Sequence, residues 1–90
     1  MDNLNIRSLE ELYKLILPAL KSKVLELKRK KITIVKEMDI FEYLRIHNWN
    51  NESNITLYDI VDDIFKLDDD IIKNYVSENL LARSSNQNEL

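Results

Sequence analysis

The 90-residue sequence contains neither cysteine nor glycine. Without cysteine there is no disulfide, no thiolate nucleophile and no thiolate metal ligand, and the single histidine, His47, cannot assemble a zinc site alone. Without glycine, neither a P-loop nor a Rossmann turn can form, because both need glycine where the backbone approaches phosphate. No serine stands in a nucleophile motif and no carboxylate pair in a catalytic context. We therefore predict a protein that is not an enzyme and that has no catalytic residues, cofactor or metal.

Long apolar runs are also missing. No run approaches the roughly 18 residues that cross a bilayer, and residues 1–7 lack the features of a signal peptide. We expect a cytoplasmic protein with no membrane insertion. The length fits one domain, 1–90, with an ordered core over about residues 6–82 and a frayed polar tail over about 83–90.

The first helix is predicted from Ser8 to about Lys30. Ser8 and Glu11 form a capping box, which is typical of a helix start. Apolar residues then recur every three or four positions, as in a helix with one buried face: Leu9, Leu12, Tyr13, Ile16, Leu20, Val24 and Leu27. Pro18 interrupts this pattern, so the helix is either kinked at Pro18 or restarted after it.

Three further helices are predicted, which makes the fold class all-α, a small bundle of about four helices. The second spans about Lys36 to His47, after a β-branched segment, residues 31–35, that we interpret as a connector plugging the core. The third begins near Thr56, with Asp59 three positions later, and its buried face is expected to be Leu57, Ile60, Val61, Ile64 and Leu67, with Phe65 adjacent. The fourth follows closely, so the last two helices should form an antiparallel or steeply angled pair. Its inner face is expected to be Ile71, Ile72, Tyr75, Val76 and Leu80.

The run Asp68-Asp69-Asp70 lies at the start of the fourth helix, where negative charge meets the positive end of the helix dipole. Adjacent carboxylates on one turn diverge, so helix capping explains the run better than a calcium site does. The aromatic residues Tyr43 and Trp49 could stack on unpaired bases, but aromatics beside apolar stripes usually belong to a core. We expect a core position for Trp49, with His47 packed beside it.

The basic residues of the first helix suggest a binding surface. Lys14, Lys21 and Lys28 are seven positions apart and drift only about 40° in all around a helix, so they form one stripe. Arg29, Lys30 and Lys31 extend the positive charge, and the resulting patch could follow an RNA phosphate backbone. The charge pattern taken alone favours a simple solvated face. Leu15 and Leu25 lie off the apolar face and are candidates for contact with another chain, a second copy included.

The charge is distributed unevenly along the chain. Residues 1–45 carry 10 basic and 7 acidic side chains, whereas residues 46–90 carry 3 and 9. The halves could face different partners, or they could attract each other within the fold; composition does not separate these alternatives.

Three blocks of sequence resemble the ComN-like post-transcriptional regulator family of Gram-positive bacteria. The blocks are Leu17-Pro18-Ala19-Leu20-Lys21-Ser22-Lys23 with Glu26-Leu27; Asp39-Ile40-Phe41-Glu42-Tyr43-Leu44 with Trp49; and Ile60-Val61-Asp62-Asp63-Ile64-Phe65-Lys66-Leu67 with Asn74-Tyr75-Val76-Ser77. The chain departs from that family at Lys30 and Lys31, where the family has a Gly-Tyr turn, and at Lys36, where it has a threonine cap.

The resemblance implies control of gene expression after transcription, in competence for example. It implies association with messenger RNA or with a protein that handles it, alongside a cell-division scaffold. The alternative is a protein-protein interaction adaptor that makes no direct contact with nucleic acid. The resemblance assigns no RNA-contacting residue, so the basic patch is an inference from charge and spacing.

Overall fold

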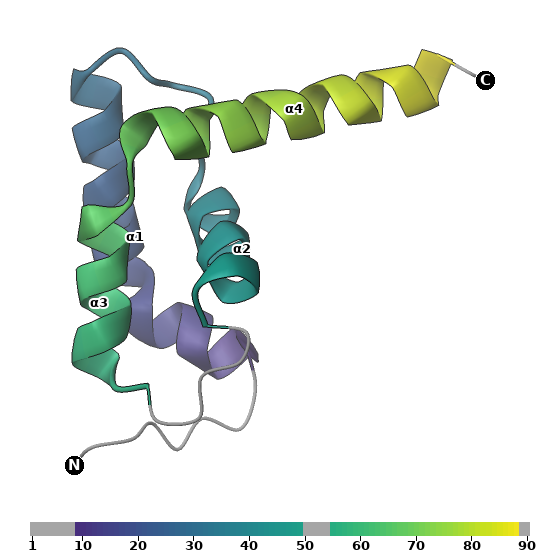
Figure 1. Ribbon diagram of the computed structural model, residues 1–90. Coiled ribbons are helices and arrows are strands. Elements are labelled where there is room, and N and C mark those ends of the chain that lie inside the picture. The colour runs from purple at the N-terminus through teal and green to yellow at the C-terminus, as the bar shows by residue number, and fades with distance from the viewer. Residues whose placement is uncertain (1–8, 50–54, 89–90) are drawn as a thin grey trace.

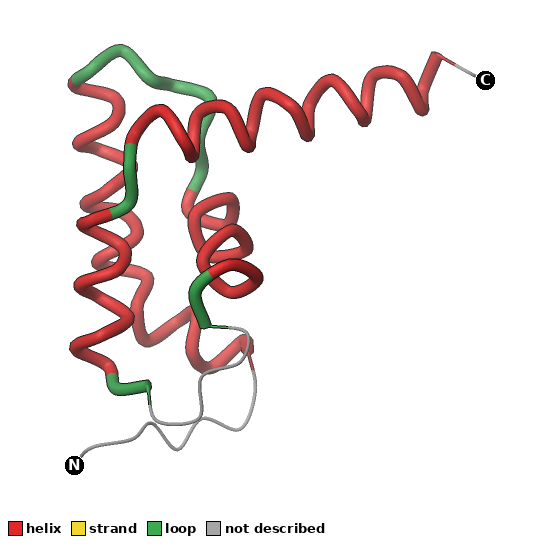
Figure 2. The backbone as a smooth tube through the Cα atoms, in the orientation of Figure 1, coloured by secondary structure: helices red, strands yellow, loops and turns green. Residues whose placement is uncertain are grey.

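The computed structural model describes residues 9–49 and 55–88. Four helices account for most of them, α1 (Leu9–Arg29), α2 (Glu37–His47), α3 (Leu57–Lys66) and α4 (Asp69–Asn88). The described part of the chain contains no strand (Figure 2). The all-α prediction is confirmed. The predicted first cap, Ser8, lies outside the described residues.

Helix α1 is continuous, with Pro18 inside it. Its first turns, purple in Figure 1, run in a different direction from its later, blue turns. Proline is the usual cause of such a bend, because it removes a hydrogen bond and its ring clashes with the preceding turn. Of the two predicted alternatives, the structure has a single kinked helix.

The turn after α1 closes on a residue with a left-handed backbone. The N–H of Ile32 donates to the carbonyl of Leu27 (2.9 Å) and the N–H of Lys31 to that of Lys28 (2.9 Å). These two bonds form a Schellman motif, which needs a positive φ at the residue that Lys31 occupies. Lys31 has a φ of 71°. Since only glycine adopts this conformation without steric cost, the backbone of Lys31 is strained.

The predicted starts of α2 and α3 are confirmed within one residue, and the caps explain them. At α3, Thr56 Oγ1 accepts from the N–H of Asp59 (3.2 Å), and the Asp59 carboxylate accepts from the N–H of Thr56 (3.1 Å). At α2, the Asp39 carboxylate accepts from the N–H of Lys36 (2.8 Å), and Lys36 has no side-chain acceptor to return the bond. The second cap is therefore half of a capping box.

The core forms where α1 packs against α2 and α3, with α4 laid across α2 (Figure 1). Val35 is buried, so the connector between α1 and α2 does plug the core, as predicted. The buried apolar residues are Leu12, Ile16, Leu20, Val24, Leu27, Val35, Ile40, Phe41, Leu44, Trp49, Ile60, Ile64, Ile72 and Val76.

Helix α4 leaves α3 at a steep angle, one of the two predicted arrangements, and extends past α2 (Figure 1). Its backbone is helical to Asn88. Four predicted inner positions are wrong, since Leu9, Leu57, Ile71 and Leu80 are exposed. Leu80 is exposed because α4 extends past α2. Phe65, predicted to lie beside the buried face of α3, is exposed as well.

Candidate nucleic-acid interface on the first helix

The outer face of α1 carries the predicted basic residues. Lys14, Lys21, Lys28 and Arg29 are all exposed, as is Lys31 in the turn that follows. Leu25 is 53% exposed, and helical spacing places Lys21 four positions before it, Lys28 three after and Arg29 four after. The apolar side chain of Leu25 is thus flanked by three cations.

Two of the six predicted contact residues are paired inside the molecule. Lys14 Nζ lies 3.6 Å from Glu10 Oε2, and both side chains are more than two-thirds exposed. Such a pair contributes little and is easily exchanged for a phosphate contact. Lys30 is held more firmly, with its Nζ 2.7 Å from Asp69 Oδ2 and 3.4 Å from Glu26 Oε2. The four others, Lys21, Lys28, Arg29 and Lys31, form no ion pair with a described residue.

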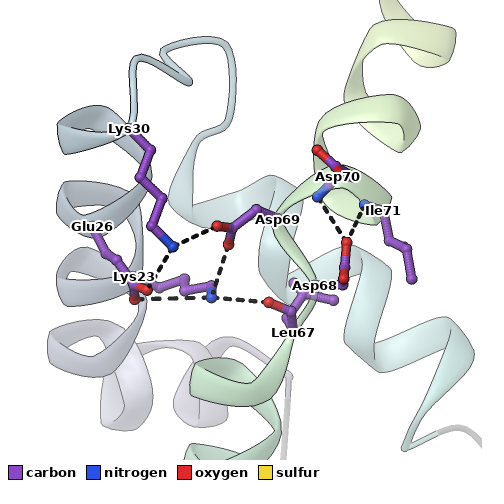
Figure 3. A network of polar contacts seen from close by, with 8 residues as sticks. All are labelled: Lys23, Glu26, Lys30, Leu67, Asp68, Asp69, Asp70 and Ile71. Carbon is purple, nitrogen blue, oxygen red and sulfur yellow. Dashed lines mark hydrogen bonds and ion pairs between the residues drawn. The ribbon is translucent and has the colours of Figure 1, made fainter.

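Another cation of α1, Lys23, points into the protein and is only 2% exposed. Its Nζ donates to the carbonyl of Leu67 (2.9 Å) and to Asp69 Oδ1 (3.4 Å), and it lies 3.9 Å from Glu26 Oε1. Figure 3 shows Lys23 of α1 and Lys30, just after α1, converging on Asp69. The ammonium therefore connects α1 to the junction between α3 and α4. A buried charge needs such partners, because desolvation is costly.

The pKa shifts in this network have opposite signs. The hydrogen bond from Lys30 and the nearby Lys23 charge lower the pKa of Asp69 below its ordinary value. The hydrogen bond to Asp69, followed by its charge and that of Glu26, raises the pKa of Lys30. Both shifts favour the charged forms, so the network is held together at neutral pH.

The neighbouring aspartates cap α4, as predicted. Asp68 Oδ1 accepts from the N–H of Asp70 (2.9 Å) and of Ile71 (3.1 Å), as Figure 3 shows. Among the described residues, no three histidine, aspartate or glutamate side chains are placed to hold a metal ion. The internal ion pairs of Asp69 with Lys23 and Lys30 also join the basic and acidic halves of the chain.

Trp49 belongs to the core, as predicted. Its ring packs edge-on against Phe41 (6.3 Å between centroids), and its Nε1 donates to Asp63 Oδ2 (2.9 Å). The prediction that His47 packs beside Trp49 is wrong. The ring contacts of the described residues place His47 against Tyr43 (4.3 Å) and Tyr75 (6.3 Å), because Tyr43 and His47 lie one turn apart on the side of α2 that faces α4.

Sequence reasoning missed Lys23, although the sequence contains a signal for it. Lys23 follows Leu20 by three positions and precedes Leu27 by four, so it falls on the buried face of α1. A lysine in phase with a leucine stripe needs a buried carboxylate or carbonyl, and the aspartate run at the start of α4 supplies one.

The two predicted partner-contact residues lie on different sides of α1. Leu25 is at the centre of the basic face, whereas Leu15 is 49% exposed and follows Glu11 by one turn. A groove of about 230 Å³ between α1 and α2 is lined by Leu9, Glu10, Tyr13, Met38, Phe41 and Glu42.

In the described part of the chain, no helix is both long enough and apolar enough to cross a bilayer. No curated protein matches the chain, and no solved structure does. A family model described as a post-transcriptional regulator matches residues 9–88, which include all four helices. The chain therefore belongs to the post-transcriptional regulator family, the ComN-like family that its three sequence blocks resemble.

Proposed function

We propose that this protein is a non-catalytic regulator that binds messenger RNA through the outer face of α1, with Lys21, Lys28, Arg29 and Lys31 as the contact residues. The observation that carries the proposal is that these four cations are exposed and have no ion pair with a described residue. Membership of the post-transcriptional regulator family supports it. Lys14 is a weaker candidate and Lys30 the weakest, because carboxylates of the chain already bind them.

The chemistry of this face suits phosphates rather than bases. Lys21 and Lys28 are separated by about 10 Å along the helix axis, since each residue rises about 1.5 Å, and their flexible side chains can follow a bending strand. The helix presents no aromatic ring among these cations. Contacts of this kind depend little on base sequence and strongly on salt. Choice of transcript would then come from RNA shape or from a second protein.

The test is a charge-reversal variant with a matched control. Lys21→Glu, Lys28→Glu and Arg29→Glu together should abolish binding to a single-stranded RNA probe, as measured by fluorescence anisotropy. A control triple variant, Lys36→Glu, Lys66→Glu and Lys73→Glu, makes the same change in net charge just before α2 and on α3 and α4, and it should retain most of the binding. Equal loss in both variants would reject the assignment to α1.

The salt dependence provides an independent measurement. Four neutralised phosphates give a slope of log K against log salt near −3, at about 0.7 per phosphate for a single strand. A slope near zero would exclude a phosphate-binding surface.

A second candidate function is favoured by one observation, the exposed Leu25 among the cations. An apolar anchor surrounded by charge is typical of contacts with a protein, and an acidic partner would fit it. Capture from lysate treated with ribonuclease separates the two functions, since a protein partner survives the treatment and an RNA bridge does not. Leu25→Ser should weaken protein capture and leave RNA affinity within about twofold, because a leucine adds nothing to phosphate binding.

A further inference from the structure

The groove between α1 and α2 is apolar at its base and along its exposed sides. Tyr13 and Phe41 form the base, and their rings meet edge-on with 5.2 Å between centroids. Leu9 and Met38 also line the groove, and each is about half exposed. The lining residues from α1 all precede Pro18, in the turns that the kink directs away from the rest of the helix (Figure 1). Exposed apolar surface in a recess rimmed by polar groups is typical of a binding site.

The groove is large enough to take a side chain from a partner. Its volume is about 230 Å³, whereas a cavity of about 150 Å³ accommodates benzene. One large aliphatic or aromatic side chain therefore fits, with room for part of a second. The flexible thioether of Met38 can adjust its shape to the incoming group.

Carboxylates surround this apolar recess. Glu10 and Glu42 line it, and no lysine, arginine or histidine is among the described residues of the lining. Burial, and then the charge of Glu37, raise the pKa of Tyr13, so a third carboxylate lies near the base. Glu37 forms no ion pair with a described residue. The groove therefore attracts cations.

The two lining glutamates are paired only within their own helices. Glu10 binds Lys14 one turn along α1, and Glu42 binds Arg45 one turn along α2. All four side chains are at least one-third exposed, and ion pairs at the surface contribute little and exchange partners readily. A cation from a partner can therefore replace Lys14 or Arg45, whereas a phosphate group would be repelled by the carboxylates.

We propose that this groove binds a basic amphipathic helix of another protein, which inserts an apolar side chain into the groove and places lysine or arginine beside Glu10 and Glu42. Grooves between packed helices commonly take such helices, whose apolar anchors lie three and four positions apart. The proposal goes beyond the proposed RNA binding and does not depend on it, because the groove and the exposed cations of α1 attract ligands of opposite charge.

The probe is a fluorescently labelled synthetic peptide of about 18 residues, a length that can form a helix alone. It carries leucine at three positions of one helix face, with lysine and alanine elsewhere. Fluorescence anisotropy with the full chain at about 0.15 M salt should show saturable binding with one peptide per chain. A matched peptide with glutamate in place of lysine should bind at least about tenfold more weakly.

Two variants of the groove are compared with a matched control. Glu10→Lys with Glu42→Lys should raise the Kd of the lysine peptide at least about tenfold, because the rim becomes repulsive. Asp70→Lys with Glu78→Lys makes the same change in net charge at exposed positions of α4, and it should leave the Kd within about threefold. Met38→Ser changes no charge and should raise the Kd at least about threefold, because apolar contact is lost. Far-UV circular dichroism verifies that each variant keeps its helices.

Failure of the lysine peptide to bind at about 1 mM protein overturns the proposal. Equal losses in the groove double variant and the α4 control also overturn it, because the peptide would then respond only to the total charge of the chain.

Two other occupants of the groove are distinguished with the same full chain. Leu4→Ser with Ile6→Ser tightens peptide binding if the chain's own N-terminal residues compete for the groove. Sedimentation equilibrium detects a dimer that Glu10→Lys with Glu42→Lys dissociates if a second copy fills it. Either result overturns the proposal, and an unchanged Kd together with a monomeric chain supports it.

Discussion

Replacing Asp69 with asparagine removes the nearer of the two carboxylates that Lys23 and Lys30 share, the other being that of Glu26. Lys23 is 2% exposed, so the substitution leaves a buried ammonium with the Leu67 carbonyl and the more distant Glu26. Breaking a fully buried pair costs about 3–5 kcal/mol. The Asp69 side chain is 23% exposed and the carbonyl contact remains, so we expect a smaller loss, about 1–3 kcal/mol in the free energy of unfolding.

The assay is urea unfolding followed by far-UV circular dichroism, with Asp70→Asn as the matched control. Asp70 is exposed and occupies the same first turn of α4, so its substitution changes the net charge and the helix dipole interaction equally. That control should cost about 0.3–1 kcal/mol. The difference between the two variants isolates the contribution of the lysines.

A double-mutant cycle sharpens the test. Lys23→Met keeps the length of the side chain and removes its charge, after which Asp69 has only Lys30 to bind. In that background Asp69→Asn should cost about 1 kcal/mol less than in the wild type. Additivity within about 0.3–0.5 kcal/mol would refute the reasoning, because it would mean that Lys23 and Asp69 do not interact.

Three further predictions follow from the caps and the pKa shifts. Lys31→Gly should raise the free energy of unfolding by about 0.5–1 kcal/mol in urea melts, because relief of the left-handed strain exceeds the entropy that glycine adds to the unfolded chain. Lys36→Thr should raise it by about 0.5–1 kcal/mol, since the hydroxyl completes the capping box with Asp39; an unchanged midpoint for either would contradict the cap assignment. The folded pKa of Asp69 lies below its ordinary value of 3.8, so its contribution to stability is present above that pH and is lost as the pH falls through the folded pKa. As the pH is lowered, the free energy of unfolding should therefore fall less steeply in Asp69→Asn than in the wild type. Parallel curves of this free energy against pH would contradict the pairing of Asp69 with the lysines.

The helices could be predicted because their local signals agree with one another. At α3, the Thr56 and Asp59 cap precedes an apolar stripe of helical period, and the structure has both the cap and the helix. The same agreement holds at α4, where Asp68 caps the first turn. Capping and period are properties of a few neighbouring residues, so they need no knowledge of the tertiary structure.

Burial on the later helices could not be predicted with the same success. Periodicity identifies an apolar face, but it does not say which neighbour covers that face or how far along the helix the cover extends. Because α4 crosses α2 and then passes beyond it, Ile72 and Val76 are buried and Leu80 is not. At α3, the apolar arc is wider than the contact with α1 and α2, which leaves Phe65 outside.

On α1, the angular position of a lysine around the helix decides whether its side chain is exposed or buried. Lys21 and Lys23 are two positions apart in sequence, yet one is exposed and the other is buried. About 200° of rotation separates them on the helix, which places them on opposite sides. The ion pair of Lys30 could not be predicted from helical phase. Its partner, Asp69, is distant in sequence, and the position of Asp69 depends on how α3 and α4 meet.

The pairing of Lys30 with Asp69 links the stability network to the proposed RNA surface. In the wild type, Asp69 and Glu26 bind Lys30, so the proposal counts only four cations of the patch as phosphate contacts. Asp69→Asn weakens the hold on Lys30, whose Nζ keeps only the 3.4 Å contact with Glu26. The freed lysine adds up to one phosphate contact, and the slope of log K against log salt should steepen by about 0.7. Asp70→Asn alters the net charge equally without touching Lys30, so its slope should match the wild type. If the two variants show equal slopes, Lys30 lies away from the bound RNA.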